Sequence, residues 1–250
     1  MRRLVFVTSV FAAALLAVAP ATAQRPTTRA AAEAAAAAAD GRLAPLEKSL
    51  AAAPDDLRSG NDYRRAVVET KQYDRAIAFF EDLVTKHPGA GNAHLNFGFA
   101  YVDKIPDAGA ITRVILANNA LNQFTKALEI ERSWIGLYTR GNSYLFWPKI
   151  FGRTSLGVAD LEEALRIQKA GSRRHYHVRV YIALGDAYWM MDDFDKAKAT
   201  WEAGLALFPD NATLKSRLGT HGEELASLIN GSYDPAKRVD TSLEDLWTDR

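Results

Sequence analysis

The chain has 250 residues, with 31 basic and 30 acidic side chains, 48% apolar residues and no cysteine. This length and apolar content suffice for one large or two small domains with a sizeable core, and the near-neutral charge argues against a disordered chain or a nucleic-acid binder. Because cysteine is absent, disulfide bonds, thiolate metal sites, a cysteine nucleophile and a lipoprotein-type lipid anchor are excluded.

The first 23 residues have the order of a secretory signal peptide. Met1-Arg2-Arg3 is basic, residues 4–19 form an uncharged apolar run, and Ala21-Thr22-Ala23 supplies small residues before a cleavage site. The alternative is a transmembrane anchor, but this run is shorter than the roughly 20 residues that span a bilayer. We therefore expect cleavage after Ala23 and a periplasmic mature protein without stable membrane insertion.

Residues 24–56 begin as a linker and continue as an alanine-rich segment. Residues 30–39 contain nine alanines and one glutamate. Alanine is the best helix former, but its methyl group gives a core little to bury. We expect a spacer there, with Leu43, Leu46 and Leu50 beginning a first helix.

A 34-residue pattern follows, and it is most complete in residues 178–211. Its members stand at offsets 4, 7, 8, 11, 20, 24, 27 and 32, and they are Tyr181, Leu184, Gly185, Tyr188, Ala197, Trp201, Gly204 and Pro209. Residues 57–90 repeat the pattern more weakly, with Tyr63, Val67, Ala76, Phe80 and Pro88. Self-similarity at this period indicates a stack of helix pairs.

Two interrupted units, residues 91–133 and 134–177, lie between these. The glycine at offset 8 recurs as Gly98, Gly141 and Gly185, at intervals of 43 and 44 residues, because extra residues separate the two helices of each interrupted unit. We expect a neighbouring helix to come close at each of these glycines.

The units resemble the tetratricopeptide repeat (TPR) family over residues 57–211, and the signal sequence suggests an exported bacterial member. The resemblance implies an all-α, right-handed superhelical solenoid of antiparallel helix pairs, with about four repeats. In residues 212–250 we expect a terminal capping helix or a fifth helix A over 212–230, followed by a C-terminal tail. The tail carries Leu243, Leu246 and Trp247 on one side of a short helix. We expect the tail to fold back on the solenoid; the alternative is that it is offered to a partner.

In a TPR solenoid the first helix of each pair, helix A, lines the concave groove. The offsets not used in packing predict a partner-binding set there, which comprises Asn96, Phe99, Tyr138, Asn142, Arg179, Asp186 and Trp189. Aromatic rings interleaved with amides suit an extended peptide, because amides bond its backbone and the rings take its apolar side chains. The alternative is that Phe99, Phe146 and Trp189 pack on neighbouring repeats or insertions.

Both insertions fall between helices A and B in consecutive units, so they should emerge on one edge of the solenoid. The first, residues 102–119, should lengthen helix B, and the second, residues 144–153, is dense in aromatic residues. One interpretation is a satellite core in which the insertions cover one another. The other is a docking site for an exported protein, with Trp147 and Phe151 as anchors.

Catalytic patterns are missing from the sequence. His175 and His177 form the one close histidine pair, in a basic loop, and there is no phosphate loop, nucleophile elbow or His-Glu-x-x-His helix. We expect no enzyme, cofactor or metal. The predicted function is a periplasmic scaffold for another exported or envelope protein or peptide, as an assembly factor or complex subunit. One alternative is a periplasmic protein that holds a small ligand between groove aromatics and insertions; another is an accessory domain that completes an enzyme's active site.

Overall fold

The structure, a computed structural model, describes residues 28–248, so the predicted signal peptide and its cleavage site lie outside the described residues. The chain divides into two units, Met1–Ala37 and Ala38–Arg250. The described part of the first unit belongs to helix α1 (Thr28–Ala52), where Arg29 pairs with Glu33 one turn later at 2.9 Å. Within residues 28–248, no helix combines the length and apolar character needed to cross a membrane.

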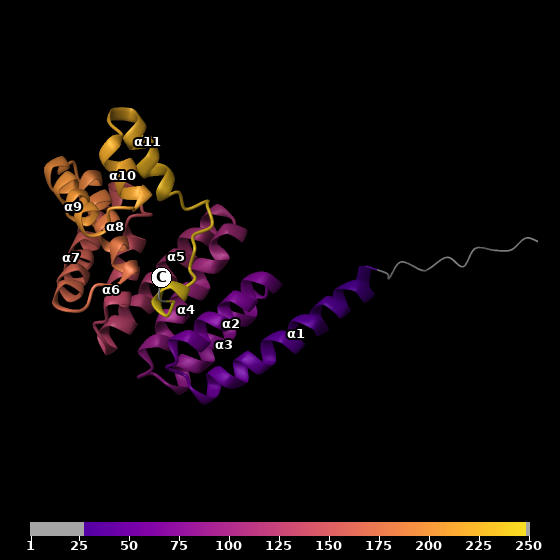
Figure 1. The fold of residues 1–250 in the computed structure, drawn as a ribbon. Helices are drawn as coiled ribbons and strands as arrows, with labels where there is room; N and C mark the ends of the chain where they lie inside the picture. Colours follow the sequence, from indigo (N-terminus) through magenta and orange to yellow (C-terminus); the bar gives the residue numbers. More distant parts are fainter. Residues whose placement is uncertain (1–27, 249–250) are drawn as a thin grey trace, which may run out of the picture. The chain divides into compact units, whose positions relative to one another are not determined.

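The second unit is a succession of helix pairs, and its described residues contain no strand (Figure 1). The pairs are α2 (Leu57–Thr70) with α3 (Tyr73–Lys86), α4 (Gly91–Lys104) with α5 (Ala110–Ile130), α6 (Trp134–Tyr144) with α7 (Thr154–Ala170), α8 (Val178–Met190) with α9 (Phe194–Leu207), and α10 (Ala212–Gly219) with α11 (Gly222–Ser232). Four 3-10 turns are η1 (Ile105–Asp107), η2 (Lys149–Phe151), η3 (His175–His177) and η4 (Glu244–Leu246). The predicted all-α solenoid is confirmed.

Side-chain caps fix the starts of several helices. Asp56, Ser133 and Asn211 precede α2, α6 and α10, and each side-chain oxygen accepts a hydrogen bond from the backbone N–H three residues later, at 2.6, 3.2 and 2.9 Å. Such a cap contributes about 1 kcal/mol by satisfying a backbone donor that the helix leaves unpaired. Three of the five described helix pairs therefore begin at a short polar residue whose side chain caps the first helix.

The glycine at offset 8 is where the two helices of a pair approach each other. A Cβ atom at Gly98 would lie 2.2 Å from a ring carbon of Phe124, and one at Gly185 would lie 2.2 Å from the indole nitrogen of Trp201. Any larger residue would have to push these buried rings away. The close approach predicted from the glycine spacing is confirmed.

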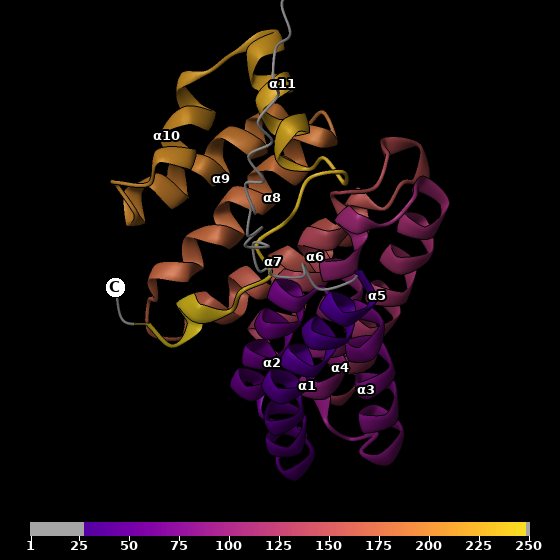
Figure 2. The same cartoon turned by 90° about the vertical axis from the view of Figure 1, so that its right-hand side faces the viewer.

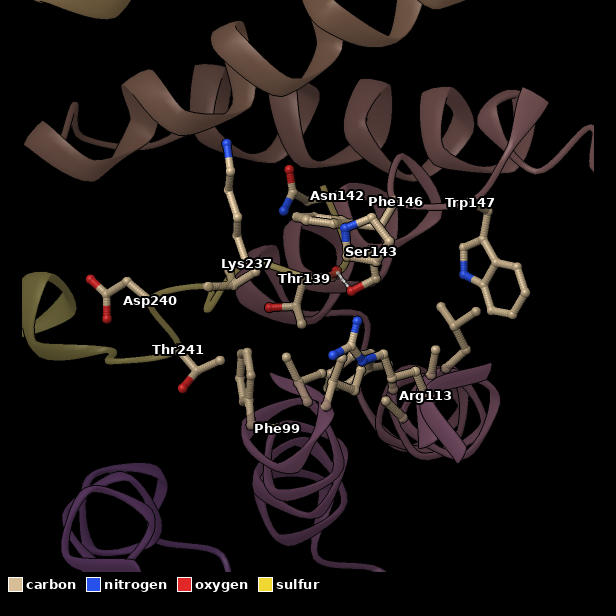
Figure 3. A pocket seen from close by; sticks show the side chains of 18 of the residues that line it. Phe99, Arg113, Thr139, Asn142, Ser143, Phe146, Trp147, Lys237, Asp240 and Thr241 are labelled. Carbon is tan, nitrogen blue, oxygen red and sulfur yellow. Dashed lines mark hydrogen bonds between the residues drawn. The ribbon is translucent and has the colours of Figure 1, made fainter. Parts of the chain in front are cut away.

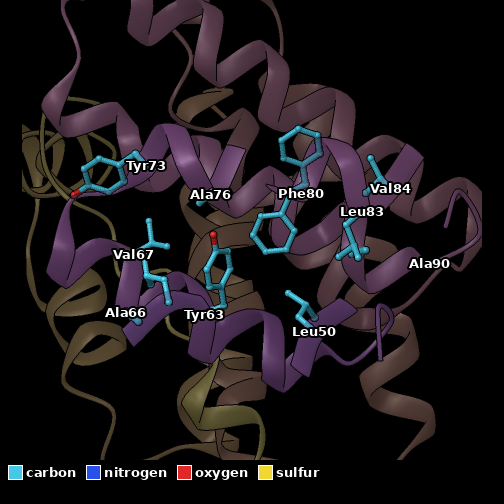
Figure 4. Close-up of a cluster of buried hydrophobic side chains, with 14 residues drawn as sticks. Leu50, Tyr63, Ala66, Val67, Tyr73, Ala76, Phe80, Leu83, Val84 and Ala90 are labelled. Carbon is cyan, nitrogen blue, oxygen red and sulfur yellow. The ribbon is translucent and has the colours of Figure 1, made fainter. Parts of the chain in front are cut away.

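The core runs along the helix pairs as a series of apolar clusters. In the first, Tyr63, Phe80 and Phe97 join α2, α3 and α4 (Figure 4). In the last, Trp201 and Ile229 join α9 to α11. Each repeat therefore buries its apolar face against the next, as expected for a solenoid.

Helix α1 differs from the expected spacer. It is a single helix that continues through the alanine-rich segment to Ala52, and Ala39, Leu43 and Leu50 are buried. Leu43 and Leu50 belong to the same cluster as Tyr63. Because alanine favours the helix, the alanine run passes without a break into the leading helix.

The two insertions contact each other. The first makes α5 21 residues long, compared with 14 in α3, as predicted. Arg153 of the second donates to Asn118 Oδ1 at 3.1 and 3.2 Å and lies 3.6 Å from the centre of the Trp147 ring. The insertions therefore meet at this contact, but Ile111, Ile150 and Phe151 remain 81%, 88% and 60% exposed, so the two insertions do not enclose the satellite core of the first interpretation.

The C-terminal tail, residues 234–248, folds back on the solenoid. Figures 1 and 2 show it leaving α11 and running along the A helices toward α2. Leu243 is 4% exposed and packs in a cluster with Leu95, Phe99 and Phe124. The predicted return of the tail is confirmed.

Candidate functional site

The groove side of α2 holds the tail by its backbone. Arg64 Nη2 donates to the carbonyl oxygen of Thr241 at 3.0 Å, and the Leu243 N–H donates to Asn61 Oδ1 at 3.0 Å. Beside these two bonds, the Leu243 side chain packs in the apolar cluster with Leu95 and Phe99. Side-chain bonds to the main chain of an extended segment, together with a pocket for one side chain, are the elements of peptide recognition.

A buried ion pair holds Arg64 in place. Its guanidinium donates to Asp103 Oδ2 and to Asn96 Oδ1, both at 3.0 Å, and it lies 4.6 Å from the centre of the Phe99 ring. Arg64 and Asp103 are each only 2% exposed. Burial lowers the pKa of the Arg64 guanidinium and Asp103 opposes that shift, but an arginine stays charged inside a protein. The tail therefore meets a fixed positive donor.

The acidic end of the tail lies on arginines. Its contacts are ion pairs of Glu244 with Arg65 and of Asp245 with Arg179, and the Trp247 ring beneath the Arg58 guanidinium at 5.7 Å. These ion pairs are a third to a half exposed, so each contributes at most about 1 kcal/mol. Their common effect is to favour an acidic segment at this end of the groove.

Beside the tail lies a cavity of about 440 Å³, lined by residues of α4, α5, α6, the second insertion and the tail (Figure 3). It gathers six of the nine residues predicted to bind a partner, and these are Phe99, Tyr138, Asn142, Trp147, Phe151 and Arg179. Burial raises the pKa of the Tyr138 hydroxyl, so this phenol stays neutral. The structure thus brings groove aromatics and insertion aromatics to one place.

Asn96 and Asp186 are corrections to the predicted site, because both are fully buried. Asn96 accepts from Arg64 and donates to the backbone oxygens of Leu57 and Asn92 at 3.3 and 3.1 Å. Its amide is therefore committed to holding α2 against α4 and is not free to bond a partner.

The second correction, Asp186, belongs to a buried ion pair at the other end of the solenoid. It accepts from Arg217 at 2.8 and 3.0 Å and from the Tyr233 hydroxyl at 3.0 Å. Trp189 lies apart from the cavity too, in the cluster of α9 to α11 and 6.2 Å from the Phe194 ring. The alternative interpretation of Trp189 as a packing residue describes its position.

Several residues of the site were not among those predicted, including Asn61 and Arg64, which bond the tail backbone, and Arg113, which lines the cavity. Arg64 stands at offset 8, which the other three units fill with glycine, so the exception itself was a signal. Asn61 stands at groove offset 5 of the first unit. Arg113 lies in the first insertion, whose conformation no repeat pattern defines.

The described residues 28–248 contain no group of three or more histidine, aspartate or glutamate side chains placed to hold a metal ion. His175 and His177 both lie in η3, and the His177 Nδ1 accepts from the backbone N–H of Arg174 at 3.2 Å. This ring therefore shapes the turn before α8.

Comparisons with known proteins agree with this architecture. Residues 57–90 and 178–221 match models of the tetratricopeptide repeat family. The crystal structure of TTC0263, a thermophilic TPR protein of Thermus thermophilus, is similar with a TM-score of 0.53 and 20% identity, over 76% of this chain and 93% of that one. YrrB, described as a TPR protein with an unusual peptide-binding site, gives a TM-score of 0.49 and 17% identity, over 80% and 88% of the chains. No curated protein matches the sequence.

Proposed function

We propose that this chain, which is built from tetratricopeptide repeats, is an exported scaffold whose groove holds an extended segment of another protein. The observation that carries the proposal is the tail itself, which α2 holds through its backbone at Thr241 and Leu243. Because such bonds do not depend on side-chain identity, a segment from another chain can form them equally well. The tail is then the occupant that a partner replaces.

The groove leaves room for a better occupant than the tail. Asn61 Nδ2 is buried and has no hydrogen-bond partner among the described residues. An unpaired buried donor costs about 1–3 kcal/mol. A partner segment whose carbonyl oxygen accepts from this amide would recover that free energy and so compete with a tail that is covalently attached.

The same contacts define the chemistry of the partner. Arg65 and Arg179 pair with tail carboxylates at half-exposed positions, and Leu243 fills an apolar pocket. A segment that presents a leucine followed by acidic residues satisfies both features. We propose an acidic, leucine-containing stretch of an exported or envelope protein, held for assembly or within a complex.

Export rests on the sequence pattern of residues 1–23. Mass spectrometry of the protein purified from its native host should find Gln24 as the first residue, in the fraction released from the periplasm. A chain that retains Met1 and stays inside the cell would contradict the export proposal and leave the groove proposal standing.

The groove proposal is tested with a labelled peptide of residues 236–248 added to the full-length protein. Leu243→Ala in the protein weakens its own tail, since burying a leucine is worth about 2–5 kcal/mol relative to alanine. Apparent affinity scales with the fraction of open groove, so the variant should bind the peptide at least about 30-fold more tightly than the wild type, the factor that corresponds to about 2 kcal/mol. Fluorescence anisotropy measures both affinities.

Two further variants control for a general effect. Arg65→Glu in the Leu243→Ala background should weaken peptide binding, because it replaces the partner of Glu244. Arg166→Glu, at an exposed position on α7 outside the groove, should leave binding unchanged. Equal binding of the peptide by the wild type and by Leu243→Ala would overturn the proposal.

A further inference from the structure

We propose that the cavity beside the tail is a binding site for an amphipathic anion, which places a carboxylate head at Arg113 and an apolar body among the surrounding aromatic rings. Arg113 takes no part in holding the tail backbone, but Thr241 and Leu243 of the tail form part of the cavity wall. The inference therefore concerns the protein with its own tail in place, and its test needs no partner peptide.

The size and walls of the cavity suit a small apolar body. Its volume of about 440 Å³ falls within the range of roughly 300–1,000 Å³ typical of small-molecule sites. Aromatic and aliphatic side chains supply most of the wall, including Phe99, Val102, Leu121, Phe124, Phe146 and Trp147. Such a wall removes apolar ligand surface from water, which is the main source of affinity.

Arg113 is the group that points to an anion. Its guanidinium is half-buried and donates to the backbone oxygens of Ala108 at 2.8 Å and Pro106 at 3.5 Å. No carboxylate among the described residues lies within ion-pair distance of it. An arginine carries five N–H donors, so these two bonds leave three for a ligand. A planar fork of that kind matches a carboxylate.

The other charged residues of the wall do not compete for this role. Arg179 already pairs with Asp245, and Lys237 is exposed and donates to the carbonyl oxygen of Gly231 at 3.1 Å. Asp240, the acidic residue of the wall, is exposed and accepts from the Ser242 N–H. The charge that faces the interior of the cavity is therefore the positive charge of Arg113.

Polar side chains of α6 lie opposite Arg113. Figure 3 shows Thr139, Asn142 and Ser143 on the side of the cavity that the Arg113 guanidinium approaches. Ser143 is occupied in donating to the Thr139 carbonyl at 2.7 Å, whereas the Asn142 amide forms no hydrogen bond with the described residues. Asn142 can thus donate to the second oxygen of a bound head group.

The cavity opens on the insertion edge. Val114 and Phe151 line it and are still 52% and 60% exposed. A ligand can enter the cavity between these two apolar side chains, which its apolar body contacts on the way in. The tail can therefore stay in the groove while the cavity fills.

The test compares dodecanoate with dodecanol on the full-length protein, by isothermal titration calorimetry. The acid and the alcohol share the apolar body and differ in charge. The wild type should bind dodecanoate at least about tenfold more tightly than dodecanol, as expected for a charge-assisted bond. This comparison needs no variant, so it holds even if a substitution disturbs the fold.

Arg113→Met keeps an apolar side chain of similar length and removes the charge. It should weaken dodecanoate binding about tenfold and leave dodecanol binding unchanged, whereas Arg166→Met, on α7, should change neither. Absence of binding by both compounds would overturn the proposal of a site. Equal affinity for acid and alcohol in the wild type would overturn the role of Arg113.

Discussion

Two buried arginine–aspartate pairs lie toward opposite ends of this solenoid, and they differ in what completes them. Arg64 and Asp103 join α2 to α4, and the spare donor of Arg64 goes to a backbone oxygen of the tail. Asp186 and Arg217 join α8 to α10, and the spare donor of Arg217 goes to Ser232.

This difference distinguishes an ion pair that only stabilises the fold from one that also binds an extended segment. Ser232 belongs to helix α11, and the Tyr233 hydroxyl closes the other side of Asp186, so the second pair is completed by the folded chain. The first pair is completed by an extended segment that any polypeptide can imitate. The Asp186–Arg217 pair is therefore satisfied by the helices themselves, and we call its end of the solenoid the closed end. The Arg64–Asp103 pair lies beneath the tail in the groove, and we call its end the open end.

The largest expected effect comes from removing either carboxylate. Asp186→Ala and Asp103→Ala each leave a buried arginine without its counter-ion, which costs about 3–5 kcal/mol in the free energy of unfolding. Denaturant unfolding measures this loss. Only Asp103→Ala should also release the tail, detected as faster proteolysis of residues 234–248 in the folded protein. Release of the tail by Asp186→Ala would break the comparison between the two pairs.

A second effect tests whether the helices pack equally closely near the two buried arginine–aspartate pairs. Gly98→Ala in α4 and Gly185→Ala in α8 each bring a Cβ atom into a buried ring, and each should lower the unfolding free energy by about 1–3 kcal/mol. Gly41→Ala in α1 meets open space and should raise it by up to about 1 kcal/mol, through helix propensity alone. A loss at Gly185 with none at Gly98 would show that the open end packs more loosely.

The third effect concerns the hydroxyls that complete each pair. Thr241→Val removes the hydrogen bond from the tail to Asp103, and Ser232→Ala removes the acceptor of Arg217. Each should cost about 1 kcal/mol. Thr241→Val should speed amide exchange in the tail, whereas Ser232→Ala should lower global stability and leave tail exchange unchanged. The reverse pattern would contradict the assignment of open and closed ends.

The smallest effect is a pH dependence at His177, in the turn η3 before α8. Burial lowers the pKa of His177 below its ordinary value of 6.5, so the unfolded chain takes up the proton first as the pH falls. Stability from this group is complete above about pH 6.5 and is lost as the pH falls below that value. His177→Gln should flatten the unfolding free energy between pH 7 and 5. If the variant shows the same dependence of the unfolding free energy on pH, that dependence comes from other groups.

The repeats were predictable because their packing is periodic and local. Gly98, Gly141 and Gly185 each serve a contact within one helix pair, so their spacing alone identified the architecture. Four of the predicted site residues, Phe99, Tyr138, Asn142 and Arg179, meet at one cavity for the same reason, since groove-facing offsets on successive A helices face the same side. Trp147 and Phe151 reach the same cavity from the second insertion.

The corrections have a different origin. Asn96 and Asp186 looked available because their offsets face the groove, but each is taken up by an arginine on another A helix, about 30 residues away. The bond from Leu243 to Asn61 joins residues 182 positions apart. Contacts of that separation depend on the full superhelix, and no repeat pattern encodes them.

The most direct test of the groove is hydrogen–deuterium exchange of the full-length protein with and without an excess of free peptide of residues 236–248. If a free peptide can replace the tail, it will speed amide exchange of the covalent tail, including the Leu243 N–H, which donates a hydrogen bond to Asn61. Amide exchange in α8 to α11 will stay unchanged. If tail exchange is the same at saturating peptide, the tail is a fixed part of the fold, and the groove is not a peptide-binding site.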